Sequence, residues 1–510
     1  MAERYLLTWK VPDLLGNGIS LLMNARRQKC CITAQFCFRI ILAAAALQIA
    51  SCAPFTAPDR SVSEVKLPPA YSLEDAVMMP PQRWWETFDS ALLEQLVGEA
   101  LAENQTLMSY WARVARAEAL ADAAGSELFP SITGETDASY TELHTDQQAL
   151  RITEGSDQYS LGLFSSYEVD LWGRIRAGKR SADLSAFATR EDLHAAAMTI
   201  TAEVANRWIG IIANQQRMQL LQQQLETNRT YLELVELRFR KALASALDVM
   251  QQRQLVERIR ARIPLAEMEG ELLRNSLAVL LGSLPQQLPV IEPQPLPLIS
   301  DLPPAGVPAQ LLGNRPDIRA ALLRLEAADQ DFVVARADRL PALRLTGRAA
   351  YDSGALESLF DNWLVNLAAG LTAPLVDGGR RRAQADASAA QINDQLAQYR
   401  QTVLTAVREV EESLTSEIKI REHIRLTENE LQAAKSALAE ARNRYVKGLN
   451  DYLPVLTQLI AVQNLEIDLI ARKEDLYLAR INLYRALGGS WVEELSIPEE
   501  YAKIQKDNQS

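Results

Sequence analysis

Two long proline-free stretches, at about 178–242 and 380–447, carry core positions that recur at alternating steps of three and four residues. In the first stretch these positions are Met218, Leu221, Leu225, Asn228, Leu232, Val235 and Phe239. A 3.5-residue period over several heptads predicts helices that pack as coiled coils. At 1.5 Å per residue each helix reaches on the order of 95 Å. We therefore expect an elongated molecule rather than a compact globule.

Shorter helical segments precede and follow each long stretch, and each is about half its length. They lie at about 91–128, 247–281, 314–339 and 453–487. We expect the chain to reverse after each long helix, so that two short helices stacked end to end match one long one. Pro264 lies inside a returning segment and predicts a kink or local break near Arg260, because proline removes a helical hydrogen bond.

The apolar period changes to two between the leading and the long helices. One such run has Tyr159, Leu161, Leu163, Tyr167, Val169 and Leu171 on one face. Alternation of this kind predicts half-buried strands, which form one β-hairpin at about 131–172 and another at about 342–376. Four strands cannot close a barrel. Three copies would supply twelve strands, although dimers and tetramers also give even numbers.

The two halves of the chain are a tandem duplication. The peptide Arg238–Lys241 matches Arg444–Lys447, and Gly173 matches Gly379, both at an offset of 206 residues. The chain is thus expected to divide into a signal peptide at 1–51, a lipidated segment at 52–90, a first repeat at 91–284, a Pro-rich linker at 285–308, a second repeat at 309–489 and a tail at 490–510.

Composition narrows the class of function. The chain has 53 Lys and Arg against 65 Asp and Glu, a net charge of −12, and no segregated basic patch, so nucleic-acid binding is not expected. No apolar stretch near twenty residues follows the N-terminus, which excludes a polytopic helical transporter. Glycine-rich phosphate loops, paired histidines at helical spacing and nucleophile elbows are missing from the sequence. An enzyme is therefore the least expected class, and we expect no cofactor and no metal site.

The N-terminal segment has the order of a lipoprotein signal. Basic residues precede the short apolar run Ile40–Leu47, and small residues then lead into Cys52. The segment resembles the lipobox of bacterial lipoproteins, in which the cysteine, here Cys52, receives diacylglycerol and becomes the mature N-terminus. Ala53 follows it, where an aspartate would retain enterobacterial lipoproteins in the inner membrane. The resemblance implies an outer-membrane location with a covalent lipid on Cys52.

The repeats and several local strings resemble the TolC-like outer-membrane factors, in particular the NodT-type efflux lipoproteins. The matching strings are Trp84–Phe88, Ser166–Arg176, Asn314–Arg319 and Leu487–Trp491. This resemblance implies a homotrimer with a twelve-stranded transmembrane β-barrel and a long periplasmic α-barrel. It also implies docking onto a periplasmic adaptor and an inner-membrane resistance-nodulation-division pump. The channel would conduct drugs or other small molecules passively, while the pump supplies the energy.

Functional residues are expected at the two helix reversals, which must dilate and meet the adaptor. We assign the aperture to Tyr445, Gly448, Asp451, Leu453, Thr457 and Asp248. We assign adaptor docking to Lys241, Leu243, Ser245, Leu247, Lys447 and Leu449. A plain core position is an equal alternative for Tyr445. Relatives commonly carry aspartates where this chain has Pro454 and Thr457, so a hydrophobic aperture formed by Leu453 or Leu456 is a second interpretation.

Other interpretations share parts of this pattern. A channel for type I protein secretion or heavy-metal efflux would have the same architecture, but the lipobox and the Trp84–Trp85 element resemble drug-efflux relatives more closely. A periplasmic adaptor also has a helical hairpin but lacks a duplicated repeat with β-hairpins. A structural coiled-coil lipoprotein does not account for the alternating strands.

Overall fold

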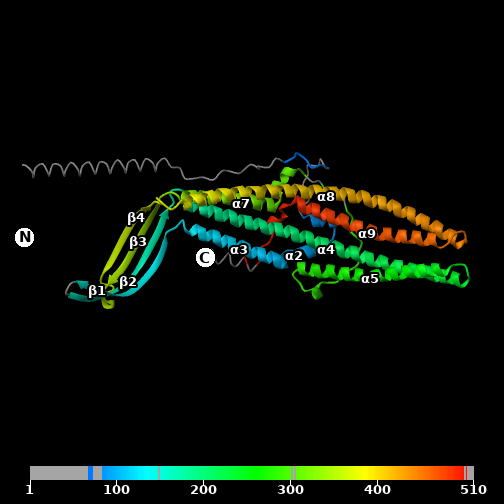
Figure 1. The fold of residues 1–510 in the computed structure, drawn as a ribbon, viewed down its shortest axis with the longest axis horizontal. Coiled ribbons are helices and arrows are strands. Elements are labelled where there is room, and N and C mark those ends of the chain that lie inside the picture. The colour runs from blue at the N-terminus through cyan, green and yellow to red at the C-terminus, as the bar shows by residue number, and fades with distance from the viewer. Residues whose placement is uncertain are drawn as a thin grey trace, which may run out of the picture.

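The computed structural model describes residues 67–72, 83–147, 150–299, 302–303, 306–498 and 501. The expected signal peptide and Cys52 lie outside these residues. The described chain is elongated, with a β-sheet at one end and the two helix reversals at the other (Figure 1).

Two helices of 67 residues form the shaft, α4 (Arg174–Arg240) and α8 (Arg380–Val446). Each begins after a glycine in the left-handed region, Gly173 with φ 80° and Gly379 with φ 83°, a conformation that favours glycine. At 1.5 Å per residue each helix is about 100 Å long. The length expected from the heptad pattern is confirmed.

The returning helices are α5 (Ala246–Leu280) and α9 (Leu453–Leu487), as the sequence predicts. The predicted break near Arg260 is wrong, because α5 runs continuously through Pro264. Pro264 is exposed, so the carbonyl that loses its helical partner lies on the accessible side of the helix. By length and composition α9 is the one described helix that could cross a membrane, but it packs along α8 and α4 as a core helix.

The leading segment of the first repeat is not one helix. It divides into α2 (Ala91–Glu103) and α3 (Gln105–Ser126) at Asn104. The Asn104 Oδ1 accepts the backbone N–H groups of Thr106 and Leu107, and its Nδ2 donates 2.8 Å to the Leu280 carbonyl at the end of α5. A buried N-cap therefore ties the break to the returning helix. In the second repeat α6 (Leu311–Asn314) and α7 (Pro316–Ala337) take the same place.

Four antiparallel strands form one sheet in the order β1 (Ser131–Gln147), β2 (Leu150–Val169), β3 (Ala342–Ser353) and β4 (Trp363–Thr372). The strands of the two repeats pair directly, with Leu161 opposite Tyr351 in β3. The central pair β2–β3 therefore joins the two hairpins, β1–β2 and β3–β4, into one continuous sheet. The outer edges of β1 and β4 carry no further strand within the described chain.

The two faces of the sheet differ in polarity. One face carries large apolar side chains that are exposed in the single chain, namely Ile132, Leu161, Leu163, Tyr351, Trp363, Val365, Leu367 and Leu371. The other face carries ion pairs, with Arg348 3.2 Å from Asp352 and Arg344 3.5 Å from Glu168. A sheet with one exposed apolar and one charged face is typical of a membrane barrel that surrounds water.

The helices lie in one layer of four at each level of the shaft. Near the sheet α3 packs on α4, α4 on α7 and α7 on α8; farther away α5 packs on α4, α4 on α9 and α9 on α8 (Figure 1). Exposed apolar side chains line α5, at Leu265, Met268, Leu272 and Val279. The outer helices and the outer strands thus lie at the same two open edges of the chain.

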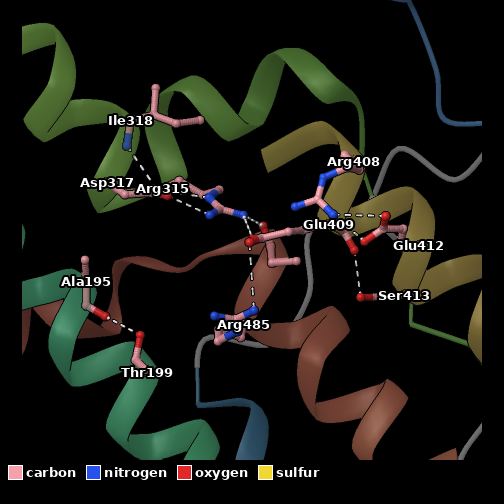
Figure 2. Close-up of polar contacts among 11 residues, drawn as sticks. Ala195, Thr199, Arg315, Asp317, Ile318, Arg408, Glu409, Glu412, Ser413 and Arg485 are labelled. Atoms are coloured by element: carbon pink, nitrogen blue, oxygen red, sulfur yellow. Dashed lines mark hydrogen bonds and ion pairs between the residues drawn. The ribbon is translucent and has the colours of Figure 1, made fainter. Parts of the chain in front are cut away.

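A buried arginine, Arg315, connects the helices near the sheet to those farther from it. The Arg315 guanidinium donates to Asp317 at 2.6 Å, to Glu409 of α8 at 2.8 Å and to the Ala486 carbonyl of α9 at 3.1 Å (Figure 2). Burial lowers the pKa of Arg315, but the hydrogen bonds and charges of Asp317 and Glu409 outweigh it and raise the pKa. The start of the second repeat is thereby fixed to both helices of its own hairpin.

Candidate aperture at the helix tips

The first tip is a tight turn closed by a capping box. The chain passes Ala242 at φ 56°, and the Leu243 N–H donates 2.8 Å back to the Arg238 carbonyl. Ser245 Oγ then accepts the Asp248 N–H at 3.1 Å, and the Asp248 carboxylate accepts the Ser245 N–H at 2.9 Å. This reciprocal pair starts α5. Ser245 and Asp248 therefore have a structural role at the turn.

The second tip repeats this turn with different residues. Gly448, at φ 73°, occupies the position of Ala242, and the Leu449 N–H donates 2.9 Å to the Arg444 carbonyl. Pro454 lies in the first turn of α9, where its missing N–H costs no hydrogen bond. The positive φ expected for Gly448 is confirmed.

The two tips lie together and line a hollow of about 1170 Å³. Nine of the predicted residues line it: Leu243, Ser245, Leu247, Asp248, Tyr445, Gly448, Leu449, Asp451 and Leu453. Lys241, Lys447 and Thr457 are exposed but do not line it. The hollow contains members of both the aperture set and the docking set that the sequence predicts.

Tyr445 is a core residue of its own chain, only 4% exposed. The Arg238 guanidinium lies 4.4 Å from its ring centre, and the Tyr452 ring lies 5.2 Å away. Burial raises the pKa of Tyr445, the nearby Arg238 opposes the rise and Asp248 adds to it. In the single chain the core interpretation of Tyr445 therefore holds, although its edge lines the hollow.

Side-chain exposure shows which of the predicted residues could form a constriction. Asp451 is exposed, whereas the Asp248 carboxylate is held in the capping box. Leu453 is 57% exposed, but Leu456 is buried at 7% and is not available to a lumen. The Thr457 hydroxyl donates 2.9 Å to the Leu453 carbonyl of its own helix.

The end of the molecule carries several exposed large apolar side chains. Leu243, Leu247 and Leu449 are 60%, 62% and 65% exposed, and Met250, which is not among the predicted residues, is 67% exposed. Exposed large apolar residues that are grouped together mark interaction sites more often than chance. Met250 could have been found from its position one turn after Leu247.

A buried polar network, which the sequence does not predict, lies behind the tips. The Tyr452 hydroxyl donates 2.7 Å to Gln252 Oε1, and Gln252 Nε2 donates to Asn228 O at 2.9 Å and Asn228 Oδ1 at 3.1 Å. Asn228 Nδ2 donates 2.7 Å to the Gln224 carbonyl, and Gln224 Nε2 donates 3.1 Å to the Gln463 carbonyl of α9. Asn228, an amide at a heptad core position, was its only sequence signal.

In the described part of the chain no group of three or more His, Cys, Asp or Glu side chains is placed to hold a metal ion. His194 lies 3.3 Å from Glu191, and His423 lies 3.9 Å from Asp468. Both histidines are accounted for by single carboxylate neighbours.

The chain combines a sheet that has one exposed apolar face with a long helical shaft. This combination defines a class of protein, the membrane-embedded channel subunits that extend far outside the bilayer. The model of the outer membrane efflux protein family matches residues 96–283 and 307–489. The chain belongs to the outer membrane efflux protein family.

Individual relatives cover most of the chain. The pyoverdine export outer membrane protein OpmQ of Pseudomonas aeruginosa is 35% identical over 80% of this chain and 88% of its own length. The solvent efflux pump outer membrane protein SrpC of Pseudomonas putida is 30% identical over 80% of this chain and 87% of its own. The solved outer-membrane channel OprN has a TM-score of 0.81 at 28% identity, covering 86% of this chain and 99% of that one.

These likenesses confirm the family, the fold class and the outer-membrane location predicted from the sequence. The protein is an outer-membrane channel component of an efflux system, and members of its family are channel proteins.

Proposed function

We propose that three copies of the chain close into one tube that carries small organic molecules from the periplasm to the exterior. The open edges carry this proposal. Strands β1 and β4 and helices α5 and α8 lie at the two sides of the chain, so a cyclic assembly joins β4 to β1 and α8 to α5 of the next copy. Three copies supply twelve strands, an even number within the range of membrane barrels.

The sheet has the polarity and length for this role. Strand β4 has 10 residues, which spans the hydrocarbon core when tilted. The face with Trp363 and Leu367 would meet lipid, and the face with Arg348 and Glu168 would line water. Conduction through such a tube needs no chemistry from the protein, so the energy comes from elsewhere.

The tips supply the gate and the docking surface. The hollow between the tips would form the aperture together with its copies, with Asp451 and Leu453 as the exposed candidates and Gly448 as the flexible turn. Leu243, Leu247 and Leu449 would meet the periplasmic adaptor. A resistance-nodulation-division pump in the inner membrane would complete the system. Lys241, Lys447 and Thr457 remain predictions for the rim of this surface.

Relatives named for pyoverdine export and solvent efflux favour a small-molecule cargo over protein secretion. Metal efflux through the same architecture is the second candidate. Lipid attachment at Cys52 is also part of the proposal, because it would hold each copy at the inner leaflet of the outer membrane.

Planar-bilayer recording of the purified protein tests the proposal. We expect discrete, mostly closed channels, which open more often in Leu453→Ala or Asp451→Ala variants, with Leu298→Ala, in the exposed linker, as the matched control. Protein that inserts into the bilayer and never conducts in any variant would contradict the proposed function.

A further inference from the structure

The polar network behind the tips joins the two repeats at the place where the aperture must widen. Tyr452 stands at the start of α9, Gln252 belongs to α5 and Asn228 to α4. All three side chains are fully buried, at 0% exposure. The network therefore links both helices of the first hairpin to the second hairpin through buried side chains.

The apolar surroundings of the network do not require polar groups. They include Val235, Leu255 and Ile259 from the first repeat and Val455 and Leu459 from the second, all nearly fully buried. At the offset of 206 residues, Tyr452 answers to Ala246 and Asn228 to Ala434. Gln252 alone keeps its residue type, at Gln458, so the other repeat lacks the tyrosine and asparagine partners that complete the network.

Buried polar groups and apolar groups respond differently when two surfaces separate. A satisfied buried hydrogen bond adds little net stability, but a buried donor or acceptor without a partner is costly. When water enters, the hydroxyl and amide groups exchange their protein partners for water. Such a network consequently favours one packed register strongly over neighbouring registers, yet it opposes full separation only weakly.

We propose that Gln252 is a positioning residue for the gate and that, with Tyr452 and Asn228, it forms a latch that selects the closed packing of the two hairpins. This inference rests on the proposed function of the tips as a gate. Gln252 is the centre of the latch, because its amide accepts from Tyr452 and donates to Asn228 at the same time. Tyr452 also borders the hollow between the tips, whereas Gln252 and Asn228 lie behind it.

Gln252→Leu tests the latch with a side chain of similar size. In the closed state it leaves the Tyr452 hydroxyl and Asn228 Oδ1 buried without their partner, whereas both are hydrated in the open state. The loss of one net hydrogen bond shifts the closed-to-open equilibrium about fivefold in each copy. If three copies open together, the open probability in planar bilayers rises of the order of a hundredfold.

A second variant separates the latch from general destabilisation. Tyr452→Phe removes the hydroxyl that Gln252→Leu leaves without a partner. The double variant Gln252→Leu/Tyr452→Phe therefore buries one unpaired polar group fewer than Gln252→Leu. We expect its open probability to be lower than that of Gln252→Leu alone. A purely structural defect would make the double variant open more often. Gln458→Leu, at the equivalent half-buried position of the second repeat, is the matched control and should behave as wild type.

Each outcome decides the inference. Gln252→Leu with raised open probability and an unchanged thermal midpoint supports the latch. Wild-type opening in Gln252→Leu, or additive effects in the double variant, overturns it while the channel function stands. If Leu453→Ala and every latch variant insert without conducting, the proposed function itself fails.

Discussion

A fully buried ion pair between α8 and α9 gives the sharpest prediction about stability. Glu417 is 0% exposed and Arg480 is 2% exposed. The Arg480 Nε donates 2.9 Å to Glu417 Oε2, and Arg421 donates 3.0 Å to Glu417 Oε1 from one turn further along α8. Replacing Arg480 by Met keeps an unbranched apolar stem and removes the main partner of a fully buried carboxylate.

Breaking such a buried pair costs about 3–5 kcal/mol, because the remaining charge stays desolvated. Arg421 keeps one bond to Glu417, so we expect a loss near the lower end, about 3 kcal/mol. Replacing both partners by apolar residues removes the buried charge as well. The double variant Glu417→Leu/Arg480→Met is therefore expected to recover most of the loss.

Thermal unfolding of the detergent-extracted protein, followed by circular dichroism at 222 nm, measures both effects. Arg480→Met should lower the midpoint by several degrees, and the double variant should return close to wild type. Arg408→Met, which removes an exposed pair with Glu412 in the same helix, is the control and should change the midpoint little. A midpoint for Arg480→Met equal to that of wild type, or a double variant less stable than Arg480→Met, would refute the reasoning.

Three further predictions concern the tips and one ion pair. Gly448 and Ala242 both have positive φ, which favours glycine over alanine. Gly448→Ala should therefore destabilise its turn by about 1 kcal/mol, and Ala242→Gly should stabilise the equivalent turn by a similar amount. Hydrogen exchange of the tip amides measures both. The same measurement should show faster exchange at the start of α5 in Asp248→Ala, by about 1 kcal/mol, since the capping box with Ser245 is lost. Burial raises the pKa of Glu191, but its bonds to neighbouring cations outweigh this and lower the pKa. Its stabilising contribution is thus present above the ordinary carboxyl pKa and is lost as pH falls. Glu191→Gln should therefore approach wild-type stability in acid. A difference in thermal midpoint between variant and wild type that stays the same from pH 7 to pH 3 would count against this.

Periodicity predicts the long elements well because the interactions that specify them recur along the chain. The heptads from Met218 to Phe239 and the alternation from Tyr159 to Val169 each repeat one contact many times. Interruptions depend on single tertiary contacts instead. Asn104 ends a helix because its amide reaches Leu280, 176 residues away, and no local pattern records that distance.

The candidate site shows the same division. Both turns and the exposed leucines of the tips follow from the duplication and from the position of Gly448. The role of Asp248 does not, because its carboxylate suits both a lumen and a cap, and only the turn geometry decides. The network around Gln252 required the packing of three helices, since an isolated glutamine in a helix is usually a surface residue.

The mass of the intact assembly tests the central claim most directly, because closure of the open edges fixes the number of copies. Native mass spectrometry of the detergent-extracted protein should give three chain masses, which supplies twelve strands and twelve helices at each level of the shaft. A dimer or tetramer would contradict the twelve-stranded barrel. A monomer would mean that the edges of β1 and β4 are not joined, and the account of a closed tube would be wrong.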